Sequence, residues 1–560
     1  MEILYIWVKE YKNLKNFGLN LSSKARFSYD HEKNSLSILK LDKLPKGFFP
    51  NNISDTVALI GKNGSGKSNA LELICNAIKG SKDVILSDFF VIARTSEAKK
   101  YIGYCKFSSL PPPKSTSVVF EEHTGDIDPV SVVFFSNVFD KRRNNFSEKI
   151  IDLSENSKER MRFRFANRNH WDVDFSKQIE FADSESYSQL GIGDPIAFNI
   201  SINVFNAASK TSNYGVPDEG LKALHSLIRR RTKDTQPTTR LVFLTQYIYI
   251  VGFLNAQFST FDYSEVEESH FYDIDYEVQK VIRENHLTDD ILKGVIGAIR
   301  ERCVEHKLLT SKSKSIFRHS TLTDGELLTA QFDFLNNLSS AVSNLEVEYS
   351  NDGIRDRSQQ SFTIPHSPGS RSLLKQFSSL LSFIRFMTLD WVGLSSGQKA
   401  YLNLFSSLSA SIKQISDKDI ILCIDEGDLY LHPKWQVDFL EYLLSVVSKA
   451  TTTKVQLILT SHSPLLISDL PRQNIEILGS DEGLDREFQT FGANLYDLYA
   501  GPLFLKGSTS GLFSALKISA FMEILKNPKS NAEEVSYVRS FLNIFGDKIL
   551  KYKFEETYKP

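Results

Sequence analysis

One octapeptide constrains this chain more than any other feature, because it fits the phosphate-binding pattern GxxxxGK[ST]. Its residues are Gly61, Lys62, Asn63, Gly64, Ser65, Gly66, Lys67 and Ser68. An apolar run at 57–60 precedes it, and apolar residues at helical spacing follow it as far as Gly80. The glycines therefore lie where a strand turns into a helix, and the free N–H groups of the helix start point at one spot. This context favours a nucleoside triphosphate site over a turn that binds nothing.

Two side chains of the octapeptide suit the charged end of such a ligand. Lys67 is predicted to reach the β and γ phosphates as a point charge. The Ser68 hydroxyl is predicted to take one coordination position of Mg²⁺. We therefore expect a triphosphate with its magnesium ion as the cofactor.

Composition indicates a reduced, globular protein of several domains. With 560 residues, 41% hydrophobic and 24% charged, the chain has an ordinary globular composition, which argues against global disorder. The net charge of -2 gives no long-range attraction to nucleic acid, so any such contact must come from local clusters. The four cysteines lie far apart without a CxxC pair, and no apolar run approaches the ~18 residues that span a bilayer. We expect a cytoplasmic protein without a membrane anchor.

The pattern of apolar residues divides the chain into four segments. Residues 1–150 form a β-rich lobe with one clear helix, 151–385 a mostly helical insertion, 386–500 a returning lobe and 501–560 a helical tail. Strands are predicted at 3–8, 35–41, 84–93, 117–120 and 130–135, and helices at 219–231, 239–258, 276–307 and 324–345. Because strand and helix signals alternate again after the insertion, we expect a parallel sheet that begins before it and is completed after it. The insertion contains no sustained heptad pattern, which favours a compact subdomain over a coiled-coil arm.

A serine-rich turn opens the returning lobe. Leu394-Ser395-Ser396-Gly397-Gln398 precedes a run with helical spacing, so its amides can form a second anion site at a positive dipole end. An ordinary helix cap is the alternative interpretation.

Two strand ends follow this turn. The apolar run 420–424 leads into Asp425 and Glu426, of which one can hold Mg²⁺ and the other can orient or deprotonate water. The run 455–460 leads into His462, whose imidazole can contact a γ-phosphate or the attacking water. Acidic strand ends are frequent and single histidines are usually structural, so each residue also has a purely structural interpretation.

Five elements follow one another along the chain: the octapeptide, the serine-rich turn, Asp425, Glu426 and His462. In this order they resemble the ATP-binding-cassette ATPases, and among them the soluble SMC-like and RecF-like group. The resemblance covers about residues 1–140 and 386–500. It implies an α/β P-loop NTPase fold with a split nucleotide-binding core and a helical insertion subdomain, and it implies ATP and Mg²⁺ as cofactors.

The same resemblance assigns roles to individual positions. Lys67, Glu426 and His462 match the Walker A lysine, the catalytic glutamate and the switch histidine. Ser68 and Asp425 match the magnesium ligands. Ser395 and Gly397 match the signature motif, whose usual third-position glycine is a serine here. No glutamine marks the Q-loop, which we place at 135–137.

In proteins of this resemblance the signature turn faces the phosphate loop of another subunit, which implies a homodimer or a higher even-numbered homo-oligomer. Residues 490–498, 504–505 and 511–518 resemble the tail of the ATPase subunits of the Septu anti-phage system and its retron-associated relatives. That likeness implies control of a separate HNH-type nuclease. In a retron complex it also implies a reverse transcriptase and its single-stranded DNA/RNA product as partners.

Basic clusters leave nucleic-acid contact open. They are Arg160, Arg162 and Arg164; 229–231 with Lys233; 141–143; and Lys312, Lys314 and Arg318. Each cluster is either a solvated surface or a phosphate track. The main rival function is a RecF-like or SMC-like DNA-repair ATPase that acts without a nuclease partner. The nucleotide-binding subunit of a transporter and a nucleotide binder that does not hydrolyse its ligand are further alternatives.

Overall fold

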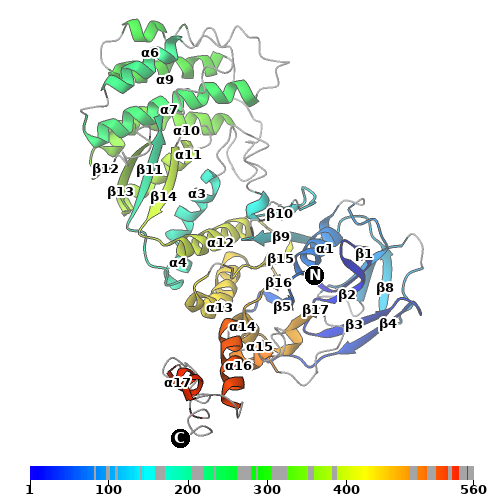
Figure 1. Ribbon diagram of the computed structural model, residues 1–560. Coiled ribbons are helices and arrows are strands. Elements are labelled where there is room, and N and C mark those ends of the chain that lie inside the picture. Colours follow the sequence, from blue (N-terminus) through cyan, green and yellow to red (C-terminus); the bar gives the residue numbers. More distant parts are fainter. Residues whose placement is uncertain are drawn as a thin grey trace.

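The chain forms a lower body around a parallel sheet and an upper lobe in which helices surround an antiparallel sheet (Figure 1). The computed structural model describes residues 1–80, 84–95, 101–107, 111–138, 140, 142, 144–157, 171–204, 219–231, 235–260, 276, 279–284, 288–305, 324–350, 359–380, 387–429, 431–479, 489–500, 512–526, 532–540 and 552. All structural statements below refer to these residues.

A six-stranded sheet of order β10-β9-β15-β16-β5-β17 forms the centre of the lower body. Its strands are β5 (Ile53–Gly61), β9 (Val130–Ser136), β10 (Ile150–Asp152), β15 (Asp419–Asp425), β16 (Val455–Thr460) and β17 (Ile475–Leu478). Every neighbouring pair runs parallel, which confirms the predicted parallel sheet. Because parallel strands end at the same edge, the loops that follow β5, β9, β15 and β16 meet there.

Both faces of this sheet are covered by other elements. Alternate residues of each strand point to opposite faces, so each strand contributes side chains to two hydrophobic clusters. Val57 and Leu59 of β5 pack in one hydrophobic cluster with helix α1 (Lys67–Lys79). Ala58 and Ile60 pack in the other cluster, which contains α12 (Ser396–Lys413) and α13 (Pro433–Ala450).

An outer sheet and a hairpin complete the lower body. The sheet has the order β2-β1-β6-β7-β8 and the hairpin is β3-β4. Their bounds are β1 Glu2–Tyr11, β2 Leu14–Asn20, β3 Ala25–Asp30, β4 Ser35–Lys40, β6 Phe89–Arg94, β7 Tyr101–Lys106 and β8 Val118–Glu122. Trp7, Phe27 and Phe90 are buried between the two layers. The strand predicted at 84–93 begins only at Phe89, and β2, β3, β7 and β10 were not predicted.

The upper lobe contains the predicted helices and three that were not predicted. Its helices are α3 (Trp171–Ala182), α4 (Glu185–Gln189), α6 (Glu219–Arg231), α7 (Pro237–Thr260), α9 (Thr288–Glu305), α10 (Asp324–Val342) and α11 (Pro368–Leu380). Of these, α3, α4 and α11 were not predicted. Helix α6 coincides with its predicted range, and α7 and α10 differ from theirs by up to three residues at each end. The helix predicted at 276–307 is described as a helix over 288–305, 279–284 and residue 276.

The upper lobe also contains an antiparallel sheet that the sequence pattern did not predict. Its order is β12-β13-β11-β14, with β11 Ala197–Asn203, β12 Glu348–Ser350, β13 Gln359–Pro365 and β14 Met387–Val392. Strand β14 pairs with β11 over its whole length. Residues 387–392, predicted to start the returning lobe, therefore belong to the sheet of the upper lobe.

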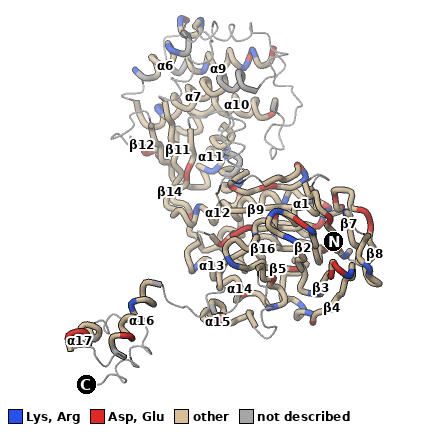
Figure 2. Tube along the Cα trace, turned by 45° about the vertical axis from the view of Figure 1, so that its right-hand side comes forward, with Lys and Arg blue, Asp and Glu red and all other residues tan. Residues whose placement is uncertain are grey.

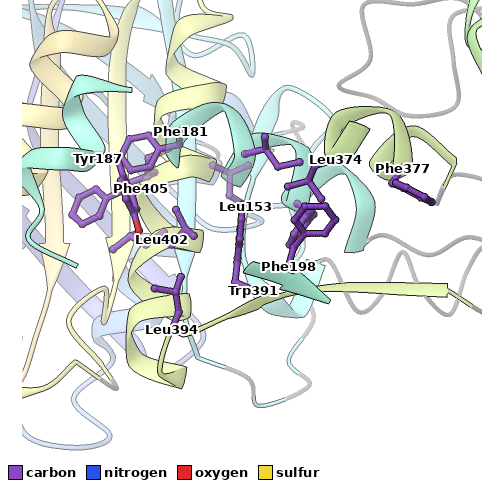
Figure 3. Packing of buried hydrophobic residues seen from close by; sticks show 14 of the residues in the cluster. Leu153, Phe181, Tyr187, Phe198, Leu374, Phe377, Trp391, Leu394, Leu402 and Phe405 are labelled. Atoms are coloured by element: carbon purple, nitrogen blue, oxygen red, sulfur yellow. The ribbon is translucent and has the colours of Figure 1, made fainter. Parts of the chain in front are cut away.

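One buried cluster runs from the parallel sheet into the upper lobe. Figure 3 shows part of it, where Leu153, Phe181 and Phe405 lie near Phe198 and Trp391. Helix α3 packs against α12, and the Trp391 indole donates a hydrogen bond to Gln178 of α3 at 3.0 Å. The upper lobe is thus packed against the helix that opens with the serine-rich turn.

Four helices and a 3₁₀ turn follow β16 among the described residues, with α14 and the 3₁₀ turn before β17 and the others after it. They are α14 (Pro464–Ser468), a 3₁₀ turn (Arg472–Asn474), α15 (Leu495–Ala500), α16 (Leu512–Lys526) and α17 (Ala532–Ser540). Among the described helices, none has both the length and the apolar character needed to cross a membrane.

Candidate functional site

The phosphate-binding octapeptide forms a tight loop between β5 and α1. Gly64 and Gly66 have φ angles of 79° and 93°, in the left-handed region that glycine adopts without strain. A Cβ atom on Gly61 would lie 2.6 Å from the carbonyl oxygen of Leu478 on β17. The loop therefore needs glycine at Gly61 for space and at the other two positions for conformation.

Lys67 opens helix α1 and turns its amine back into the loop. Its Nζ donates to the carbonyl oxygens of Gly61 at 3.1 Å and Lys62 at 3.3 Å. Burial lowers the pKa of Lys67, while the charges of Glu426 and Asp425 act in the opposite direction. The amine therefore lies close to both acids at the edge of the sheet.

The loop also contains a hydroxyl group and an open space that suit an anion. Among the described residues, the buried Ser65 Oγ has no hydrogen-bond partner. The space beside Gly64 is open, since a Cβ atom there would meet nothing within 4 Å. Buried polar atoms are normally paired, so an orphaned hydroxyl in a glycine-rich loop fits a bound phosphate oxygen.

Ser68 and Asp425 form the candidate magnesium pair. Asp425 ends β15 and is 5% exposed. Burial raises its pKa, and hydrogen bonds from the hydroxyls of Thr460 and Ser68 act against that rise. The Thr460 bond is 2.6 Å long. A hydroxyl beside a buried carboxylate is an oxygen donor set of the kind that Mg²⁺ takes, so these residues fit the ion.

Glu426 follows directly in a left-handed conformation, with φ 49°. Its N–H donates to the carbonyl oxygen and to Oγ1 of Thr460, at 3.2 and 3.0 Å. Burial and the neighbouring Asp425 raise the pKa of Glu426. Left-handed backbone at a non-glycine residue is unfavourable and is typically retained at functional sites.

His462 lies on the next loop, with Nε2 3.6 Å from Glu426 Oε1. That distance is too long for a hydrogen bond. Burial and the charge of Lys67 lower the pKa of His462, so the imidazole is neutral at neutral pH. A neutral imidazole can donate a hydrogen bond from one ring nitrogen and accept one at the other while it carries no net charge.

Hydrogen bonds tie the loops at this edge to one another. Asn137, which follows β9, donates to the carbonyl oxygen of Gly427 at 3.3 Å. Ser461 donates to the buried Asp428 at 2.5 Å. The segment predicted as the Q-loop thus lies beside the acidic strand end, although the amide of Asn137 is already engaged. Asp140 lies close enough for its charge to raise the pKa of Asp425.

The serine-rich turn lies apart from this edge, at the start of α12. Ser395 caps the helix and accepts from the N–H of Gln398, while Gln398 Oε1 accepts from the N–H of Ser395 at 2.7 Å. This capping box also matches the alternative interpretation of the turn as a helix cap. Ser395 and Ser396 are exposed and Gly397 is half-buried. The capping box occupies the N–H groups of Ser395 and Gln398.

The structure therefore brings most of the predicted site residues together. The loop 61–68, Asp425, Glu426 and His462 share one edge of the parallel sheet. Ser395 and Gly397 lie instead on α12, which packs against α3 and α13.

Of the basic clusters, only Arg142 and 229–231 lie within the described residues, and 229–231 end helix α6. Arg160, Arg162, Arg164, Lys312, Lys314 and Arg318 lie outside the described residues, as do Lys141, Arg143 and Lys233. Figure 2 shows Lys and Arg interspersed with Asp and Glu along the described chain.

Sequence reasoning missed two contributors to the site. Thr460 was read only as the end of a strand, although its hydroxyl contacts both acids. Asn13, from the turn between β1 and β2, accepts from Asn69 of α1 at 2.7 Å and donates to the carbonyl oxygen of Gly64 at 3.5 Å. No local pattern marks either residue, because each acts through a distant partner.

Comparison with known proteins finds a family and several relatives. The profile of a family described as "AAA domain, putative AbiEii toxin, Type IV TA system" matches residues 57–468. A protein named "Retron Vc95 probable ATPase" from Vibrio cholerae is 30% identical over 151 residues, 25% of each chain. "Retron Ec83 probable ATPase" from Escherichia coli is 30% identical over 99 residues, 16% of this chain and 17% of that protein. "Septu protein PtuA" from Bacillus thuringiensis is 31% identical over 101 residues, 16% of this chain and 24% of that protein.

These alignments span about a quarter or less of each relative's length. The suspected resemblance to Septu and retron ATPases is confirmed by these matches, and the parallel sheet with its glycine-rich loop fits a P-loop NTPase fold. Since the family profile covers well over half of the sequence, the chain belongs to this family of AAA-domain proteins.

Proposed function

We propose that this protein binds ATP with Mg²⁺ and hydrolyses it. The observation that carries the proposal is the convergence of Lys67, Asp425, Glu426 and His462 at the carboxyl edge of one parallel sheet. Ligands of such sheets collect at this edge.

Each residue has a defined task in this reaction. The loop amides and Lys67 bind the β and γ phosphates, and Ser68 and Asp425 hold the metal ion. When bound, Mg²⁺ neutralises charge on the phosphates. Glu426 accepts a proton from the attacking water, and its raised pKa makes it a better base than an exposed carboxylate. His462, neutral at neutral pH, orients that water or contacts the γ-phosphate.

We further propose an ATP-binding-cassette type of mechanism with two copies of the chain. The exposed turn at Ser395–Gly397 would contact the γ-phosphate held by a second copy, so that ATP joins the two chains. Each charge-assisted bond to the phosphate contributes about 1.5–3 kcal/mol. Hydrolysis would remove the shared group and weaken the contact. Residues 1–150 and 386–500, without the strand β14 that belongs to the upper sheet, would form the nucleotide-binding core, with 151–385 inserted between them and 501–560 as a helical tail.

The names of the relatives support a role in bacterial anti-phage defence. We propose that the ATPase cycle controls a partner nuclease of the HNH type, within a retron complex or a Septu-like pair, in the cytoplasm. A RecF-like DNA-repair ATPase without a nuclease partner is the second candidate, favoured by the shared type of nucleotide site. An HNH polypeptide that co-purifies with the tagged protein from its native cells supports defence, and its absence beside bound DNA supports repair.

Glu426→Gln and Lys67→Ala test the core of the proposal. We expect Glu426→Gln to bind ATP·Mg²⁺ without turnover and to accumulate as a dimer in analytical ultracentrifugation. Lys67→Ala should not bind ATP and should stay as dissociated as the wild type without nucleotide. Phosphate release and sedimentation are measured on the same samples. If Glu426→Gln with ATP sediments like the wild type without ATP, the two-copy mechanism is wrong.

A further inference from the structure

The loop that carries His462 has an anchored serine on each side of the histidine. The Ser461 hydroxyl is buried, donates to Asp428 Oδ2 at 2.5 Å and accepts from the N–H of Ser463 at 2.9 Å. The Ser463 hydroxyl donates to Gln436 of α13 at 3.2 Å. The backbone on both sides of the histidine is therefore tied to the segment that follows β15.

Asp428 receives the first of these bonds, and the proposed reaction gives it no task. It is 6% exposed and lies in a turn after Glu426. The N–H of Leu429 donates to the carbonyl oxygen of Glu426 at 3.0 Å, and the N–H of Leu431 donates to that of Asp428 at 3.3 Å. A buried carboxylate is costly unless it is paired or hydrogen-bonded. The bond from Ser461 therefore stabilises Asp428 and joins the loop after β15 to the loop after β16.

The position of the imidazole depends on this anchoring. His462 Nε2 lies 3.6 Å from Glu426 Oε1, which is too far for a direct hydrogen bond. The His462 side chain is 39% exposed, so the surrounding protein covers it only in part. The loop backbone therefore decides where the ring lies, and Ser461 and Ser463 fix that backbone.

We propose that Asp428 is a positioning residue for ATP hydrolysis, which acts through Ser461 to keep His462 beside Glu426. The inference rests on the proposed role of His462 at the γ-phosphate or the attacking water. A misplacement of about 1 Å in a catalytic group can lower a rate on the order of a hundredfold. ATP is bound mainly by the loop 61–68, so loss of the anchor should lower kcat with little change in KM.

Three substitutions test the hydrogen bond itself. Ser461→Ala removes the donor, Asp428→Leu removes the acceptor, and Asp428→Asn keeps an oxygen that can accept from Ser461. Phosphate release is measured over a range of ATP concentrations. We expect Ser461→Ala and Asp428→Leu to lower kcat at least about tenfold. Asp428→Asn should retain most of the wild-type kcat, and binding of a fluorescent ATP analogue shows whether each variant is folded.

The place of the imidazole is measured separately by NMR titration of the nucleotide-free protein with labelled histidines. Burial and the charge of Lys67 lower the pKa of His462, and Glu426 lies on its other side. Release of the loop should expose the ring and raise this pKa towards its ordinary value in Ser461→Ala and Asp428→Leu. Asp428→Asn should leave it low, and His462→Ala identifies the signal.

Ser370→Ala is the matched control. Ser370 is as fully buried as Ser461, donates to the carbonyl oxygen of Pro365 at 2.8 Å and accepts from the N–H of Ser367 at 2.9 Å. It lies on α11 of the upper lobe. Loss of its hydroxyl should change neither kcat nor the pKa of His462.

The outcomes separate this inference from the proposed function. If His462→Ala loses turnover while Ser461→Ala and Asp428→Leu keep it, Asp428 does not position His462, and the role of His462 stands. If Asp428→Asn loses as much as Asp428→Leu, the acid does not act through the Ser461 hydroxyl and the inference is wrong. If His462→Ala turns over like the wild type, the proposed role of His462 is wrong and the inference falls with it.

Discussion

The hydroxyl of Thr460 is expected to stabilise the ionised form of Asp425, and Thr460→Val tests this. Thr460 is 1% exposed and donates to Asp425 Oδ1 at 2.6 Å. It also accepts from the N–H of Glu426 at 3.0 Å. Valine keeps the shape of threonine but removes the hydroxyl, so the substitution deletes two hydrogen bonds with almost no change in volume.

The loss of stability expected for Thr460→Val follows from the charge of Asp425, which accepts the hydrogen bond. A hydrogen bond to a charged group contributes about 1.5–3 kcal/mol. The bond from the N–H of Glu426 adds little, because this N–H retains the Thr460 carbonyl oxygen at 3.2 Å. We expect Thr460→Val to lose about 1.5–3 kcal/mol of stability. Thr460→Ser keeps the hydroxyl and loses one methyl group, which should destabilise the protein by about 1 kcal/mol.

Magnesium binding provides the second measurement. Because the Thr460 hydroxyl opposes the rise in the pKa of Asp425, its loss favours the protonated carboxyl and weakens metal binding at low pH. We expect Thr460→Val to need more Mg²⁺ than the wild type or Thr460→Ser for ATP binding at pH 6, with a smaller difference at pH 8. Urea unfolding and titration of a fluorescent ATP analogue measure the two effects. If Thr460→Val and Thr460→Ser behave alike in both assays, the hydroxyl does not support Asp425.

Two further predictions concern the same edge of the sheet. Burial raises the pKa of Asp425 in the folded chain, so the folded state holds its proton more tightly than the unfolded state and stability falls as pH rises above about 4. Asp425→Asn should therefore raise the melting temperature of the nucleotide-free protein at pH 7–8 and abolish its stabilisation by Mg²⁺, and an unchanged or lower melting temperature would contradict this. Gly61→Ala places Cβ 2.6 Å from the Leu478 carbonyl oxygen and should weaken ATP binding more than tenfold. Gly64→Ala meets no neighbour and adds about 1–2 kcal/mol of backbone strain, so equal affinities of the two variants would refute the steric reasoning.

Local patterns in the sequence were sufficient for the elements that depend on near neighbours. The loop 61–68 needs glycines at fixed positions between a strand and a helix. All of these positions lie within eight consecutive residues, so the pattern can be recognised in the sequence. The buried strands β15 and β16 are continuous apolar runs, and α6 carries apolar residues at helical spacing. These signals predicted the parallel sheet and the upper-lobe helices α6, α7, α9 and α10, but not α3, α4 or α11.

The antiparallel sheet of the upper lobe had a local signal that was overlooked. In β11, buried Phe198, Ile200 and Ile202 alternate with polar residues, and β13 repeats the pattern around Phe362 and Ile364. This alternation is typical of a strand with one buried face.

By itself the sequence determined that the chain has a glycine-rich loop between a strand and a helix, a parallel sheet with acids at one strand end and helices in the upper lobe. Only the tertiary structure decided that Thr460 supports Asp425, that Gln398 joins the serine-rich turn to Ile192, and that 387–392 belongs to the upper sheet. The physical reason is the range of the interactions. Periodicity and turn chemistry act between residues a few positions apart, whereas strand pairing and buried hydrogen bonds depend on which distant segments pack together.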